Sequence, residues 1–122
     1  MVLTASLLFA ATLAQAAESR FFEVWQCSLK EGASMEQVTA ANAKWVKFVS
    51  QVVPEGRITS GTVTAVVGDY THFSIIDSYP DELAWAQAKA ALKTPAGEAA
   101  GADLDNVLDC TDNTLQSYTP SE

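Results

Sequence analysis

Hydrophobic residues in the first half of the chain change from a strand pattern to a helical one. Residues 21–29 are rich in aromatic and β-branched side chains, which is typical of a strand. A helix is predicted from Met35, because Ser34 and Gln37 have the spacing of a capping box. Residues 54–56 (Pro-Glu-Gly) are predicted to end it. Apolar side chains recur along this helix at helical intervals: Met35, Val38, Ala41, Trp45, Phe48, Val49 and Val52.

The second half of the chain predicts a hairpin, a helical region and a last strand. Residues 58–67 and 71–79 read as two strands, joined by a turn at Gly68 and Asp69. Pro80 suits the first turn of a helix that runs to Leu92, and residues 98–108 predict a second, shorter helix. Residues 110–118 predict the last strand. This β-α-β-β-α-β order is that of the ferredoxin-like α+β fold, with a four-stranded antiparallel sheet whose first and last strands are neighbours.

The first residues have the pattern of a cleaved export signal. Residues 1–17 carry no charged side chain, and the apolar run 2–14 is shorter than the roughly 20 residues that span a bilayer. Ala14 and Ala16 are the small residues that a signal peptidase recognises. We therefore expect residues 1–16 to be a signal peptide, residues 17–122 to be a single domain, and the product to be periplasmic or secreted. The alternative is a buried amphipathic or apolar N-terminal helix. We expect no membrane span in the mature chain.

The two cysteines, Cys27 and Cys110, are predicted to form a disulfide. An even number of cysteines in an exported chain favours a bridge. Antiparallel pairing of the first and last strands would bring these two residues within the ~5.5 Å between Cα atoms that a disulfide needs. Two free buried thiols and a metal pair are the alternatives. Two cysteines and one histidine make a poor zinc site, and we expect no metal.

The strands are apolar on both faces of the predicted sheet. Neighbours along a strand point to opposite faces, and the helices can cover only one face. We therefore expect a homodimer in which two sheets pack face to face. The alternative is that the C-terminal segment folds over the second face. Three adjacent apolar pairs carry this prediction: Phe21 and Phe22, Val24 and Trp25, and Ile75 and Ile76.

The charge balance excludes some classes of partner. The chain has 7 Lys and Arg against 15 Asp and Glu, a formal net charge of −8. A sequence-independent grip on nucleic acid needs a basic surface, and so does a polybasic hold on anionic lipid. We expect neither partner.

Three segments resemble the dimeric α+β barrel superfamily, which includes the antibiotic-biosynthesis monooxygenases and the stress-responsive barrel proteins. They are residues 21–29 running into Lys30-Glu31-Gly32, the helix around residues 41–45, and residues 77–80 leading into residues 83–85. Within that superfamily the chain looks most like small exported members without assigned activity. Because the superfamily contains oxygenases, haem-degrading enzymes, dehydratases and ligand sensors, the resemblance implies the fold and leaves the chemistry open.

Five residues are candidates for a ligand pocket: Trp25, Asn42, Trp45, His72 and Trp85. Asn42 interrupts the apolar stripe of the first helix, and a buried amide needs a hydrogen-bond partner such as a ligand carbonyl. Its alternative is a place at the edge of the stripe, in contact with water. The tryptophans would suit a flat hydrophobic ligand, or they are core and dimer-interface anchors.

The titratable candidates are His72 and Glu23. His72, the only histidine, is expected on a central strand, as a general base, an iron ligand or a hydrogen-bonded structural residue. The structural role is favoured, since the haem-degrading members take their iron-binding histidine from a helix. Glu23 on the first strand is a candidate for a carboxylate whose pKa is perturbed by burial.

No motif in the chain identifies a cofactor or a reaction. The acidic residues between Asp103 and Asn113 lack the glycine and glutamate of an EF-hand, so capping and a solvated edge explain them better. Nucleotide and hydrolase fingerprints are missing. The sequence favours binding of a small, largely apolar molecule without a tightly held cofactor. A cofactor-independent monooxygenase and a non-catalytic interaction module are the alternatives.

Overall fold

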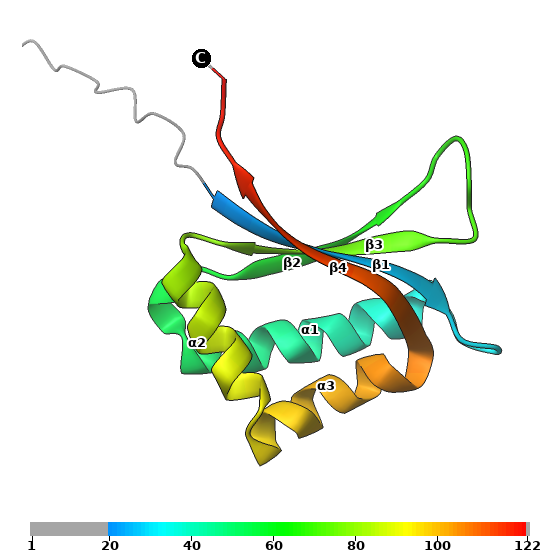
Figure 1. The fold of residues 1–122 in the computed structure, drawn as a ribbon. Helices are drawn as coiled ribbons and strands as arrows, with labels where there is room; N and C mark the ends of the chain where they lie inside the picture. Colours follow the sequence, from blue (N-terminus) through cyan, green and yellow to red (C-terminus); the bar gives the residue numbers. More distant parts are fainter. Residues whose placement is uncertain (1–19, 122) are drawn as a thin grey trace, which may run out of the picture.

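Four antiparallel strands form one sheet in the order β2-β3-β1-β4, and three helices cover one of its faces (Figure 1). This computed structural model describes residues 20–121, so the predicted signal peptide lies outside the described residues. The element order is β-α-β-β-α-α-β, which confirms the ferredoxin-like α+β fold. The elements are β1 (Arg20–Leu29), α1 (Met35–Val52), a 3-10 turn (Pro54–Gly56), β2 (Thr59–Thr64), β3 (Phe73–Tyr79), α2 (Glu82–Leu92), α3 (Pro95–Val107) and β4 (Leu108–Tyr118).

The first helix begins and ends where its sequence pattern predicts. The Ser34 side chain accepts a hydrogen bond from the Gln37 backbone amide, and the Gln37 side chain accepts one from the Ser34 amide. Pro54 starts the 3-10 turn that follows the helix. The buried face of α1 packs against the sheet and against α2 and α3; it consists of Val38, Ala41, Asn42, Trp45 and Val49.

The third helix begins earlier than the sequence pattern suggests. The sequence predicts the start of this helix at residue 98, but Thr94 is the N-cap of α3 and its side chain accepts from the Gly97 amide. Pro95 then occupies the first turn, where a missing N–H costs nothing. A side chain at Gly97 would place its Cβ 2.2 Å from the Ala91 carbonyl oxygen. Glycine therefore allows α2 and α3 to meet at a sharp corner.

The β2–β3 hairpin is shorter than predicted and its connection is longer. The two strands cover residues 59–64 and 73–79, so a tight turn at Gly68 and Asp69 is wrong. The Asp69 side chain instead accepts from the backbone amide and the hydroxyl of Thr71, which holds a wider loop. This connection projects beyond the sheet on the side away from the helices (Figure 1). Val66 and Val67 are 87% and 89% exposed there.

The first and last strands are neighbours and carry the predicted disulfide. Cys27 and Cys110 are register partners, and their sulfur atoms are bonded. A register shift lies between Gln26 and Cys27, so β4 bulges beside the bridge. The last strand begins at Leu108, two residues before the predicted start.

The three helices lie on one side of the sheet and leave its opposite face free of other described elements (Figure 1). We call this the open face; its apolar residues are Phe22, Val24, Val63, Ile76 and Tyr118. The rings of Phe22 and Tyr118 meet edge to face, with 5.7 Å between centroids. The C-terminal residues pair with β1 as far as Tyr118 and do not fold over the open face. Among the described residues, no helix has the length and hydrophobicity needed to span a membrane.

Candidate functional site

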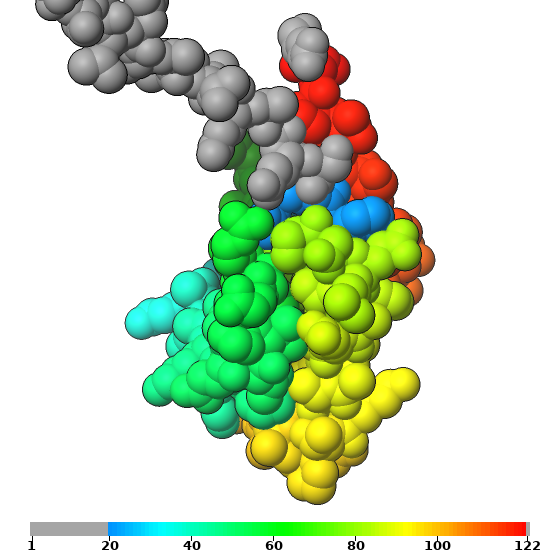
Figure 2. Space-filling view, turned by 90° about the vertical axis from the view of Figure 1, so that its left-hand side faces the viewer, coloured from blue at the N-terminus to red at the C-terminus, as the bar shows by residue number. Residues whose placement is uncertain are grey.

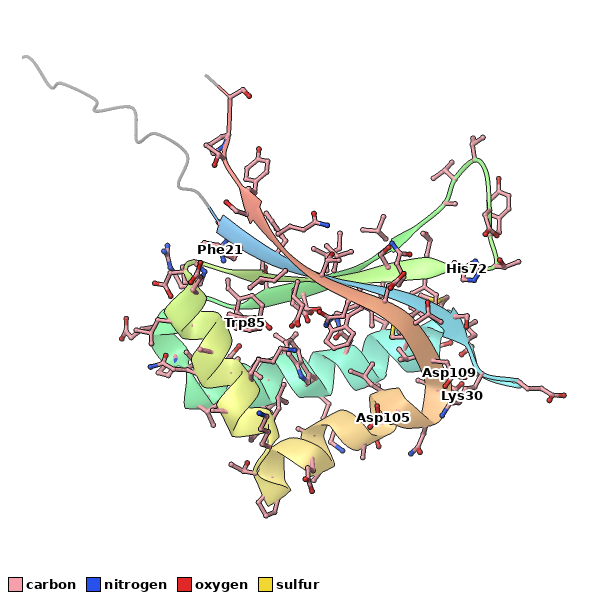
Figure 3. The ribbon with its side chains drawn as sticks, viewed as in Figure 1. Phe21, Lys30, His72, Trp85, Asp105 and Asp109 are labelled. Carbon is pink, nitrogen blue, oxygen red and sulfur yellow. A yellow bond between two sulfur atoms is a disulfide. The ribbon has the colours of Figure 1, made fainter. Side chains whose placement is uncertain are left out.

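A cavity of about 600 Å³ lies between the helix-covered face of the sheet and the helices. In the end-on view of Figure 2, the residues that follow α1 (green) lie against α2 (yellow-green) and close one end of the helical layer. Lys30, Asp105 and Asp109 gather at the other end, where α3 passes into β4 (Figure 3). These three residues also line the cavity. Six large apolar side chains contribute to its wall: Trp25, Trp45, Ile75, Leu92, Leu104 and Leu108.

Asp77 on β3 is the centre of a buried polar network on this wall. Its side chain is only 3% exposed. The Trp25 indole Nε1 donates to Asp77 Oδ2 at 3.2 Å, and the Ser60 hydroxyl donates to Asp77 Oδ1 at 2.5 Å. Asn42 on α1 donates to the same Ser60 oxygen at 2.8 Å. The carboxylate thus accepts from an indole and a hydroxyl, neither of which carries charge.

The pKa of Asp77 is raised from 3.8 to about 6. Burial is the largest cause, because a low-dielectric environment disfavours the charged form. The negative charge of Glu23 raises the pKa further. The hydrogen bonds from Ser60 and Trp25 and the positive charge of Lys89 lower it, but they do not offset the loss of solvation. Asp77 is therefore a carboxylate that changes its protonation state close to neutral pH.

Glu23 on β1 is a second buried carboxylate, and unlike Asp77 it has a direct cation partner. Lys89 Nζ on α2 lies 2.7 Å from Glu23 Oε1, and Asn113 on β4 donates to Glu23 Oε2 at 2.9 Å. The Lys89 ammonium also lies 4.7 Å from the centroid of the Trp25 ring. Burial and the charges of Asp77 and Glu23 raise the pKa of Tyr79, so its phenol stays neutral. Lys89 is one of the residues that line the cavity, and its ion pair with Glu23 fixes the position of its ammonium there.

The structure brings three of the five predicted pocket residues together. Trp25, Asn42 and Trp45 all line the cavity. Trp85 on α2 packs instead against the core around Trp45 and Tyr79, at the end of the sheet marked by Phe21 (Figure 3). Its indole N–H is buried and has no hydrogen-bond partner within residues 20–121.

The expected place of His72 on a central strand is wrong. His72 precedes β3, is exposed, and lies in the projecting β2–β3 connection (Figure 3). Its Nδ1 lies 2.9 Å from Asp69 Oδ2 and 2.9 Å from the Thr71 hydroxyl. The strand starts later because the Asp69 side chain organises the preceding residues into a loop. His72 does not line the cavity.

The pattern along β3 contains a signal for Asp77 that sequence reasoning missed. Phe73, Ile75, Asp77 and Tyr79 share one face of the strand, and the other three are core residues. A carboxylate on an otherwise apolar strand face is a functional candidate in its own right. Lys89 and Ser60 had no such signal, because their partners come from other elements.

The acidic residues between Asp103 and Asn113 do not form a cluster. Asp103 on α3 pairs with Lys44 at 3.2 Å, and Asp109 at the start of β4 lies 3.8 Å from Lys30. The Asn113 side chain on β4 donates to Glu23 Oε2 on the neighbouring strand β1. In the part of the chain that the structure describes, no three His, Cys, Asp or Glu side chains are grouped so that they could hold a metal ion.

Comparison with solved structures establishes the fold class. The chain is similar to SnoaB, a cofactor-independent oxygenase from Streptomyces nogalater, with a TM-score of 0.56 and 12% identity, covering 87% of this chain and 96% of that one. A putative antibiotic biosynthesis monooxygenase from Caulobacter crescentus matches with a TM-score of 0.55 and 11% identity, covering 88% and 94%. A dimeric ferredoxin-like protein of unknown function from Thermobifida fusca matches with a TM-score of 0.52 and 11% identity, covering 88% and 96%.

These similarities lie in structure and not in sequence. No protein-family model and no curated protein matches the chain. At 11–12% identity the shared feature is the fold, so the predicted likeness to ferredoxin-like dimeric α+β barrel proteins is confirmed at that level. The chemistry has to be argued from the cavity itself.

Proposed function

We propose that this protein binds a small, flat, largely apolar molecule in the cavity between sheet and helices. One observation carries the proposal: a cavity of about 600 Å³ has two tryptophans and four aliphatic side chains on its wall, with Asn42 and Asp77 among them. Ligand sites are typically 300–1,000 Å³ clefts that combine apolar walls with a few polar groups. The aromatic rings supply contact area, and the polar groups set the orientation of the ligand.

The proposed ligand carries a polar atom at one edge. Asn42 and Asp77 belong to one hydrogen-bonded chain through Ser60, so both side chains are held in place before a ligand arrives. Such pre-organisation lowers the entropy lost on binding. Lys89 on the same wall offers a positive charge to a carbonyl or hydroxyl oxygen. A flat ring system with one or two oxygen atoms fits this arrangement best.

We further propose that the functional unit is a homodimer formed through the open face. Phe22, Val24 and Ile76 lie next to one another in the register of β1 and β3, on a face that the helices leave free. A second copy of the same face is complementary to it by symmetry. The similar protein from Thermobifida fusca is described as dimeric, which supports this assignment.

Export to the periplasm or the medium completes the proposal. The Cys27–Cys110 disulfide is of a kind that persists in oxidising compartments. Mass spectrometry of protein from its own host is expected to give a chain beginning at Ala17. An intact chain beginning at Met1 would contradict the export signal.

An enzyme of the cofactor-independent oxygenase kind is the second candidate. The fold likeness to SnoaB favours it, as does a carboxylate on the cavity wall whose pKa lies near neutrality. In that case Asn42, Trp45 and Asp77 would position a substrate that itself activates dioxygen. A purely structural interaction module is the weakest candidate, because it would not need an unfilled cavity with polar groups on its wall.

Blocking the cavity tests the binding proposal. A Cβ added at Gly101 on α3 meets no atom within 4 Å, and Gly101 lines the cavity. Gly101→Leu is therefore expected to fill the binding space without disturbing the fold. Ala102→Leu, one residue further along the same helix at an exposed position, is the matched control. The probe is 2-tetralone, a flat bicyclic ketone, and binding is measured by quenching of tryptophan fluorescence.

We expect saturable quenching in the wild type and in Ala102→Leu, with affinity at least tenfold weaker in Gly101→Leu. Circular dichroism checks that all three proteins fold alike. Equal affinity in the three proteins, or no saturable quenching in the wild type, would contradict ligand binding in this cavity.

A further inference from the structure

We propose that the cavity is a proton-transfer site, in which Asp77 removes a hydrogen from a carbon next to a carbonyl group and Lys89 stabilises the resulting enolate. The inference rests on the proposed binding function and adds the substrate class: a flat ketone or related carbon acid. It concerns residues that the sequence pattern did not single out.

The two groups face the same space with opposite charge. Asp77 and Lys89 both line the cavity, one from β3 and the other from α2. Trp25 contacts both groups: its indole N–H donates to Asp77, and its ring lies under the Lys89 ammonium. A planar substrate bound beside Trp25 would therefore meet a base and a cation.

The hydrogen bonds leave Asp77 able to accept a proton. Each of its oxygen atoms receives one neutral donor, and a carboxylate oxygen has a further lone pair available. Lys89, by contrast, forms an ion pair with Glu23, with 2.7 Å between Lys89 Nζ and Glu23 Oε1. The cluster thus separates two roles: Glu23 fixes the ammonium, and Asp77 remains without an ion pair of its own.

Burial gives Asp77 a basicity suited to catalysis near neutral pH. A buried carboxylate without a direct cation partner is costly, so a fold that retains one points to a task for it. The pKa of about 6 lies in the range in which a general base is both ionised and basic enough to act. The charged groups that act on Asp77 are Glu23 from β1 and Lys89 from α2, and Asp77 in turn acts on Tyr79 of β3. The other titratable groups on the cavity wall are Lys30 after β1, Glu98 and Asp105 from α3 and Asp109 from β4, whereas α1 contributes none.

The proposed step balances without an oxidant or a co-reactant. The C–H bond breaks, its proton goes to an Asp77 oxygen, and the electron pair becomes the enolate. The negative charge then lies on the former carbonyl oxygen, next to Lys89. The carboxyl proton of Asp77 exchanges with solvent, and Asp77 then delivers a solvent-derived proton to the same carbon, which exchanges its hydrogen. In an unsaturated ketone Asp77 can instead deliver the proton to another carbon of the conjugated system, which shifts the double bond. The reaction class is therefore enolisation or isomerisation of a ketone.

Hydrogen exchange into 2-tetralone tests this step. The protein is incubated with 2-tetralone in D₂O, and proton NMR follows the loss of the signals from carbons next to the carbonyl. We expect the wild type to exchange them about 100-fold faster than Asp77→Asn, a typical contribution of a general base. Asp77→Glu is expected to retain part of the rate. Asp103→Asn removes an exposed carboxylate of α3 that pairs with Lys44 and does not line the cavity, and it is the control, with a rate equal to the wild type.

The pH profile separates a chemical role from a structural one. The wild-type rate is expected to fall as pH decreases through about 6, where Asp77 takes up a proton. This profile also decides the matter if Asp77→Asn fails to fold, because it needs no variant. A rate that does not change between pH 5 and pH 8 would overturn the inference.

Binding and exchange fail independently. Saturable binding of 2-tetralone with exchange no faster than in Asp77→Asn would overturn proton transfer and leave the binding function in place. Absence of binding to the wild type would overturn the binding function, and the proton-transfer inference with it.

Discussion

Glu23 on β1 and Asp77 on β3 are direct partners in the antiparallel register, and both side chains point to the helix-covered face, where they are 2% and 3% exposed. Like charges directly opposite each other destabilise a sheet. Here Lys89 neutralises one of them, and the pKa of the other is raised. The two carboxylates therefore differ in their surroundings: Glu23 forms an ion pair with Lys89, whereas burial raises the pKa of Asp77.

Asp77 is expected to make the stability of the protein depend on pH. Its pKa is about 6 in the folded state against an ordinary value of 3.8, so the folded state holds the proton more tightly. The contribution of Asp77 to the free energy of unfolding is therefore most favourable below pH 3.8. It decreases as pH rises through about 6, by up to about 3 kcal/mol. Urea unfolding at a series of pH values measures this.

Asp77→Asn provides the reference, because it cannot titrate. The free energy of unfolding of Asp77→Asn minus that of the wild type is expected to increase between pH 4 and pH 7. Taking the difference removes the contributions of other titrating groups. A difference that is constant over this range would show that the carboxylate is not perturbed.

Reducing the disulfide is expected to lower stability strongly. Cys27 and Cys110 are 83 residues apart, so the bridge restricts most of the unfolded chain. The chain-entropy estimate for such a loop is about 4.5 kcal/mol. The check is urea unfolding of the oxidised protein and of the reduced, alkylation-blocked protein. A loss below about 1 kcal/mol would mean that the bridge adds little to the fold.

A charge on the open face is expected to dissociate the proposed dimer. Ile76 pairs with Val24 and Gly61 on that face, so Ile76→Lys places an ammonium at the centre of the interface. Leu83→Lys adds the same charge at an exposed position on α2 and is the control. Sedimentation equilibrium is expected to give a dimer for the wild type and the control, and a monomer for Ile76→Lys. A wild-type monomer at micromolar concentration would refute the dimer.

The two glycines of α3 are expected to respond in opposite ways to alanine. A Cβ at Gly97 would lie 2.2 Å from the Ala91 carbonyl oxygen and 2.5 Å from Leu92 Cα, so Gly97→Ala is expected to cost about 2 kcal/mol or more. Gly101 has open space, and alanine there is expected to stabilise the helix by up to about 1 kcal/mol. Thermal unfolding of both variants compares them. Equal effects would mean that the α2–α3 corner is not tightly packed.

Local signals in the sequence were sufficient for the fold. The capping box at Ser34, the apolar stripe of α1 and the cysteine spacing each depend on nearby residues or on strand pairing, and the structure has all three. The predicted element boundaries were wrong where a side chain changed the backbone locally. Asp69 widens the β2–β3 connection and Thr94 caps α3, and both residues are also common in ordinary turns.

The site could be predicted only in part, because its chemistry comes from contacts between distant elements. Trp25, Asn42 and Trp45 were found since they stand out within their own strand or helix. The ion pair of Glu23 with Lys89 joins residues 66 positions apart, and Asn113 joins it from the last strand. Hydrophobic periodicity gives no information on which polar residues of different elements will meet.

The three tryptophans allow the most direct test of the cavity as a binding site. Trp25 and Trp45 line it and Trp85 does not, so each indole N–H reports on a different place. In a nitrogen–proton correlation NMR spectrum, assigned with single Trp→Phe variants, added 2-tetralone is expected to shift the indole signals of Trp25 and Trp45 and to leave that of Trp85 unchanged. Unshifted signals for Trp25 and Trp45, or a shift at Trp85 alone, would contradict binding in the cavity.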